Sequence, residues 1–350
     1  MSKERVSAED LLNRRGFLKL SGLAGGAAIM GPLGSGVQVA YGAEAFPARK
    51  VTWVVGQAAG GGTDLMVRGI VPFFQKHLKQ NSGSPDKVGL VVKNLPGGGG
   101  MRTMNEVRHG RPDGYIIACD GEMLHTNTVL GTLGFDMFSL TYISRIAAAA
   151  KVLVTNSRSN INSWDDLVKL SKKNPVKLGI TGFGASNHVA SVLFIDTTRL
   201  NAKPVIFDGS AGLSAALIRG DVAVGMQSED SVKNLVDANE MRPLLTFSER
   251  TKYPQVQNVK DIGFPQLNDV VSSQRYVFAP PGMPLPIKQK LAESLKAAVT
   301  DKDFLTWNEK AGMSIDPVFG SDLEKLVKNI HKFYMSKERT LKEYLSENAK

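Results

Sequence analysis

Short apolar runs alternate with amphipathic helical segments along most of this chain, and this alternation restricts the fold more than any other feature. Residues 51–56 (VTWVVG) form such a run, and residues 63–79 place their apolar side chains on one face at helical spacing. The order then repeats, with apolar runs at 88–95 and 115–120 on either side of a second helical segment. A β-α-β-α-β order predicts an α/β protein with a parallel sheet and right-handed crossovers.

The middle of the chain continues the same pattern, and the chain ends in long helices. Ser163 is expected to cap the helix that follows it, because Asp165 and Asp166 lie in the first turn of that helix. Further strands are expected at 151–156, 176–182, 203–209 and 221–227, a strand and turn at 274–284, and amphipathic helices at 285–312 and 321–345. Two α/β units can be consecutive or interleaved, and the residue pattern alone leaves both arrangements open.

The first 45 residues have the features of an export signal. The motif NRRGFLK at 13–19 resembles a twin-arginine signal, and a modestly apolar, glycine-rich stretch follows it. Ala43–Ala45 (AEA) fits a small-x-small cleavage site. An ordinary secretory signal with two adjacent arginines is the alternative. We expect residues 1–45 to be cleaved and the mature protein to lie in the periplasm.

Charge and composition narrow the classes of partner. The formal net charge is +10, but the lysines and arginines are scattered and form no run of five or more. A scattered positive charge suits an anionic small molecule, and we expect no nucleic acid or membrane surface as a partner. Cys119 is the only cysteine, so no intramolecular disulfide can form. The five histidines lack metal-ligand spacing, and we expect neither a metal nor a cofactor.

The polar loops after the predicted strands are the candidate ligand site, because open parallel sheets bind ligands beyond the carboxyl ends of their strands. A helix that begins at a glycine-lined turn offers free N–H groups and the positive end of its dipole, which bind a carboxylate as well as a phosphate. Thr63, Ser186 and Ser210 would add hydroxyl donors there. Asp64 could either cap its helix or hold a bridging water or an ammonium group.

Two other functions have weaker support in these loops. No G-x-x-x-x-G-K-[ST] string occurs, and the G-x-G-x-x-G pattern fails at Leu65 in the first loop and at Asn187 in GFGASN. The GASNH string resembles a nucleophile elbow, but Ser186 and His188 are two residues apart on a helix that is just beginning, so their side chains diverge. We therefore expect no catalytic residue, and an exported hydrolase remains the less favoured alternative.

Six motifs in order make a family resemblance. GQAAGGGTDLMVRG is followed by NLPGGGG, PDGY, TGFGASNH, FDGSAGLSAALIRGDVAV and FAPPGMP. Together they resemble the substrate-binding proteins of tripartite tricarboxylate transporters, the Bug family, from about Phe46 to the C-terminal helix. The resemblance implies a type II periplasmic-binding-protein fold, in which two α/β lobes joined by two crossovers hold a ligand between them. We accordingly expect one lobe from 46–147 with 275–350 and the other from 148–274.

The resemblance also implies which residues bind the ligand. The family uses the loops that correspond here to Ala58–Asp64, Thr181–His188 and Phe207–Ser210. The predicted ligand-binding residues are Gln57, Ala58, Ala59, Gly60, Thr63, Asp64, Glu122, Thr181, Gly182, Ser186, His188, Asp208 and Ser210.

Several residues depart from the family pattern. The family usually has proline and an aromatic residue at the positions of Gly56 and Gln57, and a basic or neutral residue at Asp208. Glu122 and Glu229 also lie on cleft loops. These acids either point to solvent or indicate a ligand other than a plain di- or tricarboxylate, such as an amino acid, an amide or a hydroxylated acid.

The resemblance therefore predicts a monomeric periplasmic solute-binding protein. It would close around a small carboxylate by a hinge motion and deliver it to the subunits of a membrane transporter. A receptor of the same fold that feeds a sensor system is the main alternative.

Overall fold

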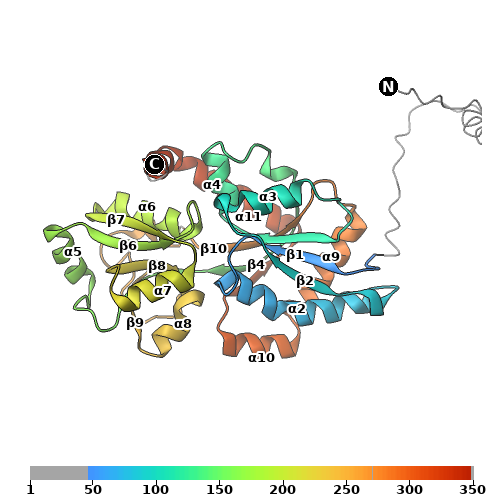
Figure 1. The fold of residues 1–350 in the computed structure, drawn as a ribbon, viewed down its shortest axis with the longest axis horizontal. Helices are drawn as coiled ribbons and strands as arrows, with labels where there is room; N and C mark the ends of the chain where they lie inside the picture. Colours follow the sequence, from blue (N-terminus) through green and yellow to red (C-terminus); the bar gives the residue numbers. More distant parts are fainter. Residues whose placement is uncertain (1–45, 270, 348–350) are drawn as a thin grey trace, which may run out of the picture. The chain divides into compact units, whose positions relative to one another are not determined.

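The structure is a computed structural model that describes residues 46–269 and 271–347 (Figure 1). The predicted export signal lies outside the described residues. Within the described part of the chain, no helix has the length and apolar character that a membrane span requires.

The first sheet has six strands in the order β11-β4-β10-β3-β1-β2. β1 runs parallel to β2 and β3, whereas β10 runs antiparallel to β3 and β4. The parallel sheet predicted from residues 51–120 is confirmed for β1 to β3, whereas β10 is antiparallel because the chain enters it from the second sheet and not through a helix of the first. The strands are β1 (Val51–Val55), β2 (Leu90–Asn94), β3 (Ile116–Asp120), β4 (Thr141–Ala149), β10 (Ser273–Ala279) and β11 (Ile315–Val318).

The second sheet has five strands in the order β7-β6-β8-β5-β9. β6 runs parallel to β7 and β8, and β5 runs antiparallel to β8 and β9. The strands are β5 (Lys151–Asn156), β6 (Val176–Thr181), β7 (Ala202–Phe207), β8 (Val224–Ser228) and β9 (Met241–Thr246).

Helices cover both faces of each sheet. Side chains of α2, α9 and α10 pack on one face of the first sheet, and those of α3, α4 and α11 pack on the other (Figure 1). On the second sheet, α5, α6 and α12 contribute to one core cluster and α7 and α8 to the other. The helices are α2 (Gly62–Gln80), α3 (Met101–Arg108), α4 (Met123–Val129), α5 (Trp164–Lys173), α6 (Ser186–Thr198), α7 (Ser210–Arg219), α8 (Glu229–Asp237), α9 (Leu285–Val299), α10 (Lys302–Ala311), α11 (Gly320–Ser336) and α12 (Glu338–Glu347).

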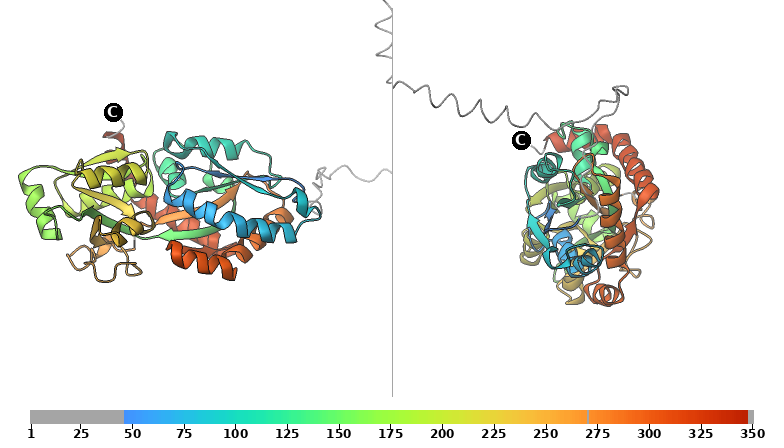
Figure 2. Two further views of the ribbon diagram at one scale, coloured as in Figure 1. Left: turned by 60° about the horizontal axis from the view of Figure 1, so that its bottom comes forward. Right: turned by 90° about the vertical axis from the view of Figure 1, so that its right-hand side faces the viewer.

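Two neighbouring connections join the sheets. β4 ends at Ala149 and β5 begins at Lys151, so the first connection is a single residue. The second enters β10 at Ser273, which pairs with Ala149. The green strand β4 and the orange strand β10 run side by side between the two sheets (Figure 2). The predicted boundaries between lobes stay a prediction. Strands of the first sheet come from both ends of the described chain, while Leu341 and Leu345 of α12 pack with the second sheet.

Most local predictions are confirmed, and two are wrong. The Ser163 hydroxyl caps α5 and accepts a hydrogen bond from the Asp166 N–H at 3.2 Å. The helix expected at 285–312 is instead α9 and α10, because the Asp301 side chain caps a new helix. The helix expected at 321–345 divides at Lys337 into α11 and α12. The pattern also missed several elements: β4, β9, β11, α4 and α8.

The packing of α12 generates a stability prediction. Leu341 is fully buried, so Leu341→Ala should lower the free energy of unfolding by about 2–5 kcal/mol in urea titrations. Leu285 is 62% exposed, and the matched control Leu285→Ala should change the free energy of unfolding by less than about 0.5 kcal/mol. Equal values for the two variants would contradict the packing of α12.

Candidate functional site

A pocket of about 760 Å³ opens among loops from both sheets, a volume typical of small-molecule sites. Most of the predicted ligand-binding residues line it: Gln57, Ala58, Ala59, Thr63, Glu122, Thr181, Gly182, Ser186, Asp208 and Ser210. Gly60, Asp64 and His188 do not line it. Loops from the first and the second sheet therefore contribute to one site.

Three helix N-termini contribute to this pocket. The first residues of α2, α6 and α7 line it, and no side chain among the described residues caps any of the three helices. The N–H groups of a first helical turn have no partner inside their own helix. These donors and the positive dipole ends favour a negatively charged ligand group at the pocket.

A run of four glycines adds another wall. Gly97 to Gly100 line the pocket and have φ values of 113°, 59°, 58° and 86°, which residues with a Cβ rarely adopt. The Asn127 side-chain amide donates to the Gly99 carbonyl at 2.7 Å and holds this loop. The predicted site omitted these residues, although the run NLPGGGG was part of the family resemblance.

Asp64 braces the first glycine loop and does not face the pocket. It is 2% exposed and accepts hydrogen bonds from the Gly60 N–H, the Arg68 Nε and the Asn94 amide, each at 2.9 Å. Burial raises the pKa of Asp64, but the hydrogen bonds outweigh this effect and the pKa is lowered. The carboxylate therefore fixes the turn that aims α2 at the pocket.

His188 has a similar structural place in the second loop. Its ring is fully buried, and Nδ1 accepts a hydrogen bond from the Gly184 N–H at 3.1 Å. The ring also lies edge-on to Phe183, with centroids 5.3 Å apart. Burial lowers the pKa of His188 to about 4, so a neutral imidazole shapes the loop.

Lys151 supports the pocket from beneath, and the sequence analysis missed it. Its side chain is fully buried. Its Nζ donates to Ser186 Oγ at 2.7 Å, to Asn187 Oδ1 at 2.8 Å and to Ser273 Oγ at 2.5 Å. A lysine ammonium has three N–H donors, and all three are used here. Lys151 thus joins the start of β5, the start of α6 and the start of β10.

The contacts with Lys151 orient the neighbouring serines as hydrogen-bond donors. Ser186, Ser228 and Ser273 line the pocket, and Ser273 Oγ lies 2.5 Å from Ser228 Oγ and 3.2 Å from Ser186 Oγ. Because Lys151 occupies a lone pair on Ser186 and on Ser273, their hydroxyl protons point away from the ammonium. The protons point toward one another or into the pocket, and we call these three serines with Lys151 the donor floor.

Glu122 is a buried carboxylate whose charge interacts with that of Lys151. Burial lowers the pKa of Lys151 and raises that of Glu122, and the charge of each group opposes the shift of the other. One Glu122 oxygen accepts a hydrogen bond from the Gln274 N–H. Glu122 is 5% exposed and lines the pocket.

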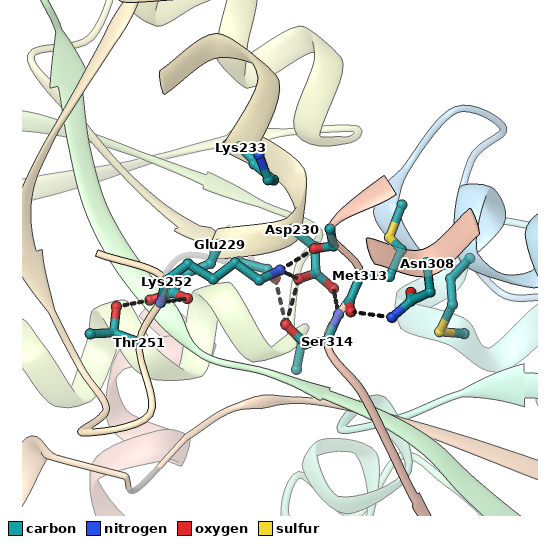
Figure 3. Close-up of polar contacts among 12 residues, drawn as sticks. Glu229, Asp230, Lys233, Thr251, Lys252, Asn308, Met313 and Ser314 are labelled. Carbon is teal, nitrogen blue, oxygen red and sulfur yellow. Dashed lines mark hydrogen bonds and ion pairs between the residues drawn. The ribbon is translucent and has the colours of Figure 1, made fainter. Parts of the chain in front are cut away.

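Arg275 is a second buried cation at the pocket. Its Nη1 donates to Asp230 Oδ2 at 2.8 Å, and its Nε has no hydrogen-bond partner among the described residues. Asp230 also binds the Lys252 ammonium and accepts a hydrogen bond from Ser314 Oγ at 2.6 Å (Figure 3). Burial raises the pKa of Asp230, but Arg275 and Lys252 outweigh it and hold the pKa at about 2. This network fixes the guanidinium at the pocket wall.

The remaining acids differ in where they face. Asp120 ends β3 and lines the pocket, where Oδ1 accepts from the Gly121 N–H at 2.7 Å and from Gln57 Nε2 at 3.0 Å. Asp208 also lines the pocket. Glu229 does not, because its carboxylate accepts from the Lys252 N–H at 2.9 Å and from the Thr251 hydroxyl (Figure 3). Asp120 and Arg275, like Lys151, were not among the predicted site residues.

Comparison with known proteins gives the family. A family model described as the tripartite tricarboxylate transporter family receptor matches residues 76–339, which is most of the chain. The chain belongs to this family. It is 25% identical over 261 residues to the protein BugT of Bordetella pertussis, covering 71% of this chain and 76% of BugT.

Solved structures of other proteins share the fold. MatC of Rhodopseudomonas palustris, solved with bound malate, has a TM-score of 0.70 at 19% identity and covers 85% of this chain and 100% of its own. Rpa4515 of R. palustris, solved with adipate, has a TM-score of 0.72 at 22% identity and covers 86% and 98%. The fold is therefore that of the periplasmic binding proteins, with two α/β lobes.

The electrostatics of Asp120 generate a prediction about pH. Burial raises the pKa of Asp120 from 3.8 to about 6, so the folded state holds this proton more tightly than the unfolded chain. The stabilising contribution of the protonated Asp120 carboxyl group is fully present below pH 4 and is lost as the pH rises through 6. The Asp120→Asn variant has a neutral side chain at this position at every pH. The difference between its free energy of unfolding and that of the native protein should therefore rise between pH 4 and 7, by up to about 3 kcal/mol.

Urea titrations at pH 4, 5, 6 and 7 measure this difference. Comparing the two proteins at each pH cancels the contributions of all other titrating groups. A difference that is constant, or that shrinks as the pH rises, would contradict the burial of this carboxyl group.

Proposed function

We propose that this protein is a periplasmic solute-binding protein that captures a small carboxylate and delivers it to a tripartite tricarboxylate-type membrane transporter. Its family membership supports the transport role. The observation that carries the ligand class is the donor floor, together with three uncapped helix N-termini at the same pocket. Hydroxyl and backbone donors backed by a buried ammonium form a site for a carboxylate.

The relatives support the same ligand class. MatC holds malate and Rpa4515 holds adipate in their structures, and both ligands are small dicarboxylates. The pocket of about 760 Å³ has room for ligands of this size.

Closure of the lobes would be the working step, and no bond is made or broken in it. The sheets are joined at Ala150 and just before Ser273, and Ser273 pairs with Ala149. Two connections that lie side by side form a hinge, because small dihedral changes in both rotate one lobe relative to the other. The same pocket would serve a receptor that feeds a sensor system, and the gene neighbourhood of a transporter or a kinase would separate the two roles.

An exported hydrolase is the second candidate function, and the contact between Lys151 and Ser186 bears on it. A serine beside a neutral lysine can act as a nucleophile. Here the Nζ lies within hydrogen-bond distance of three oxygens, as many acceptors as an ammonium needs, and the charge of Glu122 favours this charged form against the effect of burial. His188 Nδ1 accepts a hydrogen bond from the Gly184 N–H, so this nitrogen is not free to take a proton from Ser186. The geometry therefore favours binding, and turnover of an ester that Ser186→Ala abolishes would reverse this conclusion.

A thermal-shift screen tests the function directly. Malate, adipate, succinate, glutarate, citrate, aspartate and glutamate are suitable probes. A ligand at one hundred times its dissociation constant stabilises the native state by about 2.7 kcal/mol, so at least one probe should raise the melting temperature in proportion to the logarithm of its concentration. A melting temperature that no carboxylate changes would contradict the proposal.

The donor floor makes a more specific prediction. Lys151→Met removes the ammonium and keeps a long apolar side chain, so calorimetry should show a loss of affinity of about 10- to 100-fold for the tightest probe. Lys177 is exposed on β6, and Lys177→Met is the matched control that should bind like the native protein. Unchanged affinity in a folded Lys151→Met variant would show that the floor does not hold the carboxylate.

A further inference from the structure

The pocket also has an acidic wall whose hydrogen-bonding capacity is only partly used among the described residues. Asp120 is 2% exposed and lines the pocket. Its Oδ1 accepts two hydrogen bonds, but its Oδ2 is buried and has no partner among the described residues. No lysine or arginine in the described part of the chain forms an ion pair with it. A buried carboxylate without a cation is costly, and at a ligand pocket it indicates a donor on the ligand.

The surroundings of Asp120 are shaped to admit this carboxylate. A Cβ built on Gly56 would lie 2.2 Å from Oδ2, and one built on Gly100 would lie 3.3 Å from it. Any side chain at position 56 would therefore displace Asp120. Gln57 turns its amide to Oδ1, and its own Oε1 is buried without a partner.

A second acid extends the wall. Glu122 lies two residues after Asp120, lines the pocket and is 5% exposed. The wall thus presents the oxygens of Asp120, Gln57 and Glu122, whereas the donor floor presents hydroxyls above Lys151. A ligand that carries only carboxylates would satisfy the floor and leave Asp120 Oδ2 without a donor, beside a like charge.

We propose that the ligand is a small amino acid, whose protonated amine donates to Asp120 while its carboxylate binds the donor floor. This inference rests on the proposed function and names the substrate class of the same pocket. A zwitterion matches both the donor floor and the acidic wall, because its carboxylate lies near the Lys151 ammonium and its amine lies near the Asp120 carboxylate. Asp120 is then the residue that distinguishes an amino acid from the same acid without its amine.

Matched pairs of probes test the proposal by calorimetry on the mature protein. L-aspartate is compared with succinate, L-glutamate with glutarate, and L-leucine with 4-methylpentanoate, so each pair differs only in the amine. At least one amino acid should bind at least tenfold more tightly than its partner. Equal or tighter binding of every deaminated acid, or no binding by any of the three amino acids, overturns the proposal.

Asp120→Asn tests the residue itself. Asparagine keeps the Oδ1 acceptor and removes the charge, so the preference for the amino acid should fall at least tenfold while the affinity for its deaminated partner changes less than threefold. Asp86 is exposed and does not line the pocket, so Asp86→Asn is the matched control and should keep the native preference. An unchanged preference in Asp120→Asn overturns the assignment of Asp120.

The outcomes separate this proposal from the proposed function. If the deaminated acids bind and the amino acids gain nothing, the protein is still a carboxylate-binding protein and only the amine site fails. If no carboxylate binds, with or without an amine, both fail. The comparison of native pairs needs no variant, so the proposal stays falsifiable even where Asp120→Asn does not fold.

Discussion

The buried ammonium of Lys151 is the interaction on which the pocket depends. It lies where the chain first passes between the sheets, and it binds Ser186 at the start of α6 and Ser273 at the start of β10. A buried charge is tolerated only where its hydrogen bonds are satisfied, so the position of Lys151 requires both segments to stay in contact with it. The two hydrogen bonds among Ser186, Ser228 and Ser273 use two of the three hydroxyl protons and leave one for a ligand. One residue therefore links the hinge to the chemistry of the pocket.

The fold brings the other groups to this point by simple topology. In each sheet the parallel strands present their carboxyl ends along one edge. The loop before α2 leaves such an edge of the first sheet, those before α6 and α7 leave that of the second, and all three line one pocket. Asp230 then holds Arg275 at the wall, and Lys252 and Ser314 complete that network from two other segments (Figure 3). The result is a site with a cationic floor and an acidic wall, which suits a ligand that carries both charges.

The parts of this site that could be predicted from the sequence are those fixed by the local pattern of apolar and polar residues. Thr63, Ser186 and Ser210 follow strand-like runs and precede helical ones, and this periodicity placed them at helix starts. Lys151 and Ser273 are 122 residues apart, and their contact depends on burial that no local pattern reveals. Asp64 and His188 occur in the expected loops, yet they hold backbone N–H groups of those loops and do not line the pocket. The sequence shows which loop a residue occupies but not which way its side chain turns.

The most direct measurement is a crystal structure of the mature protein with the tightest-binding probe. We expect a ligand carboxylate within hydrogen-bond distance of the hydroxyls of Ser186 or Ser273 and of N–H groups at the start of α6, with the Lys151 contacts intact. A carboxylate bound elsewhere in the pocket, with Lys151 detached from both serines, would contradict it.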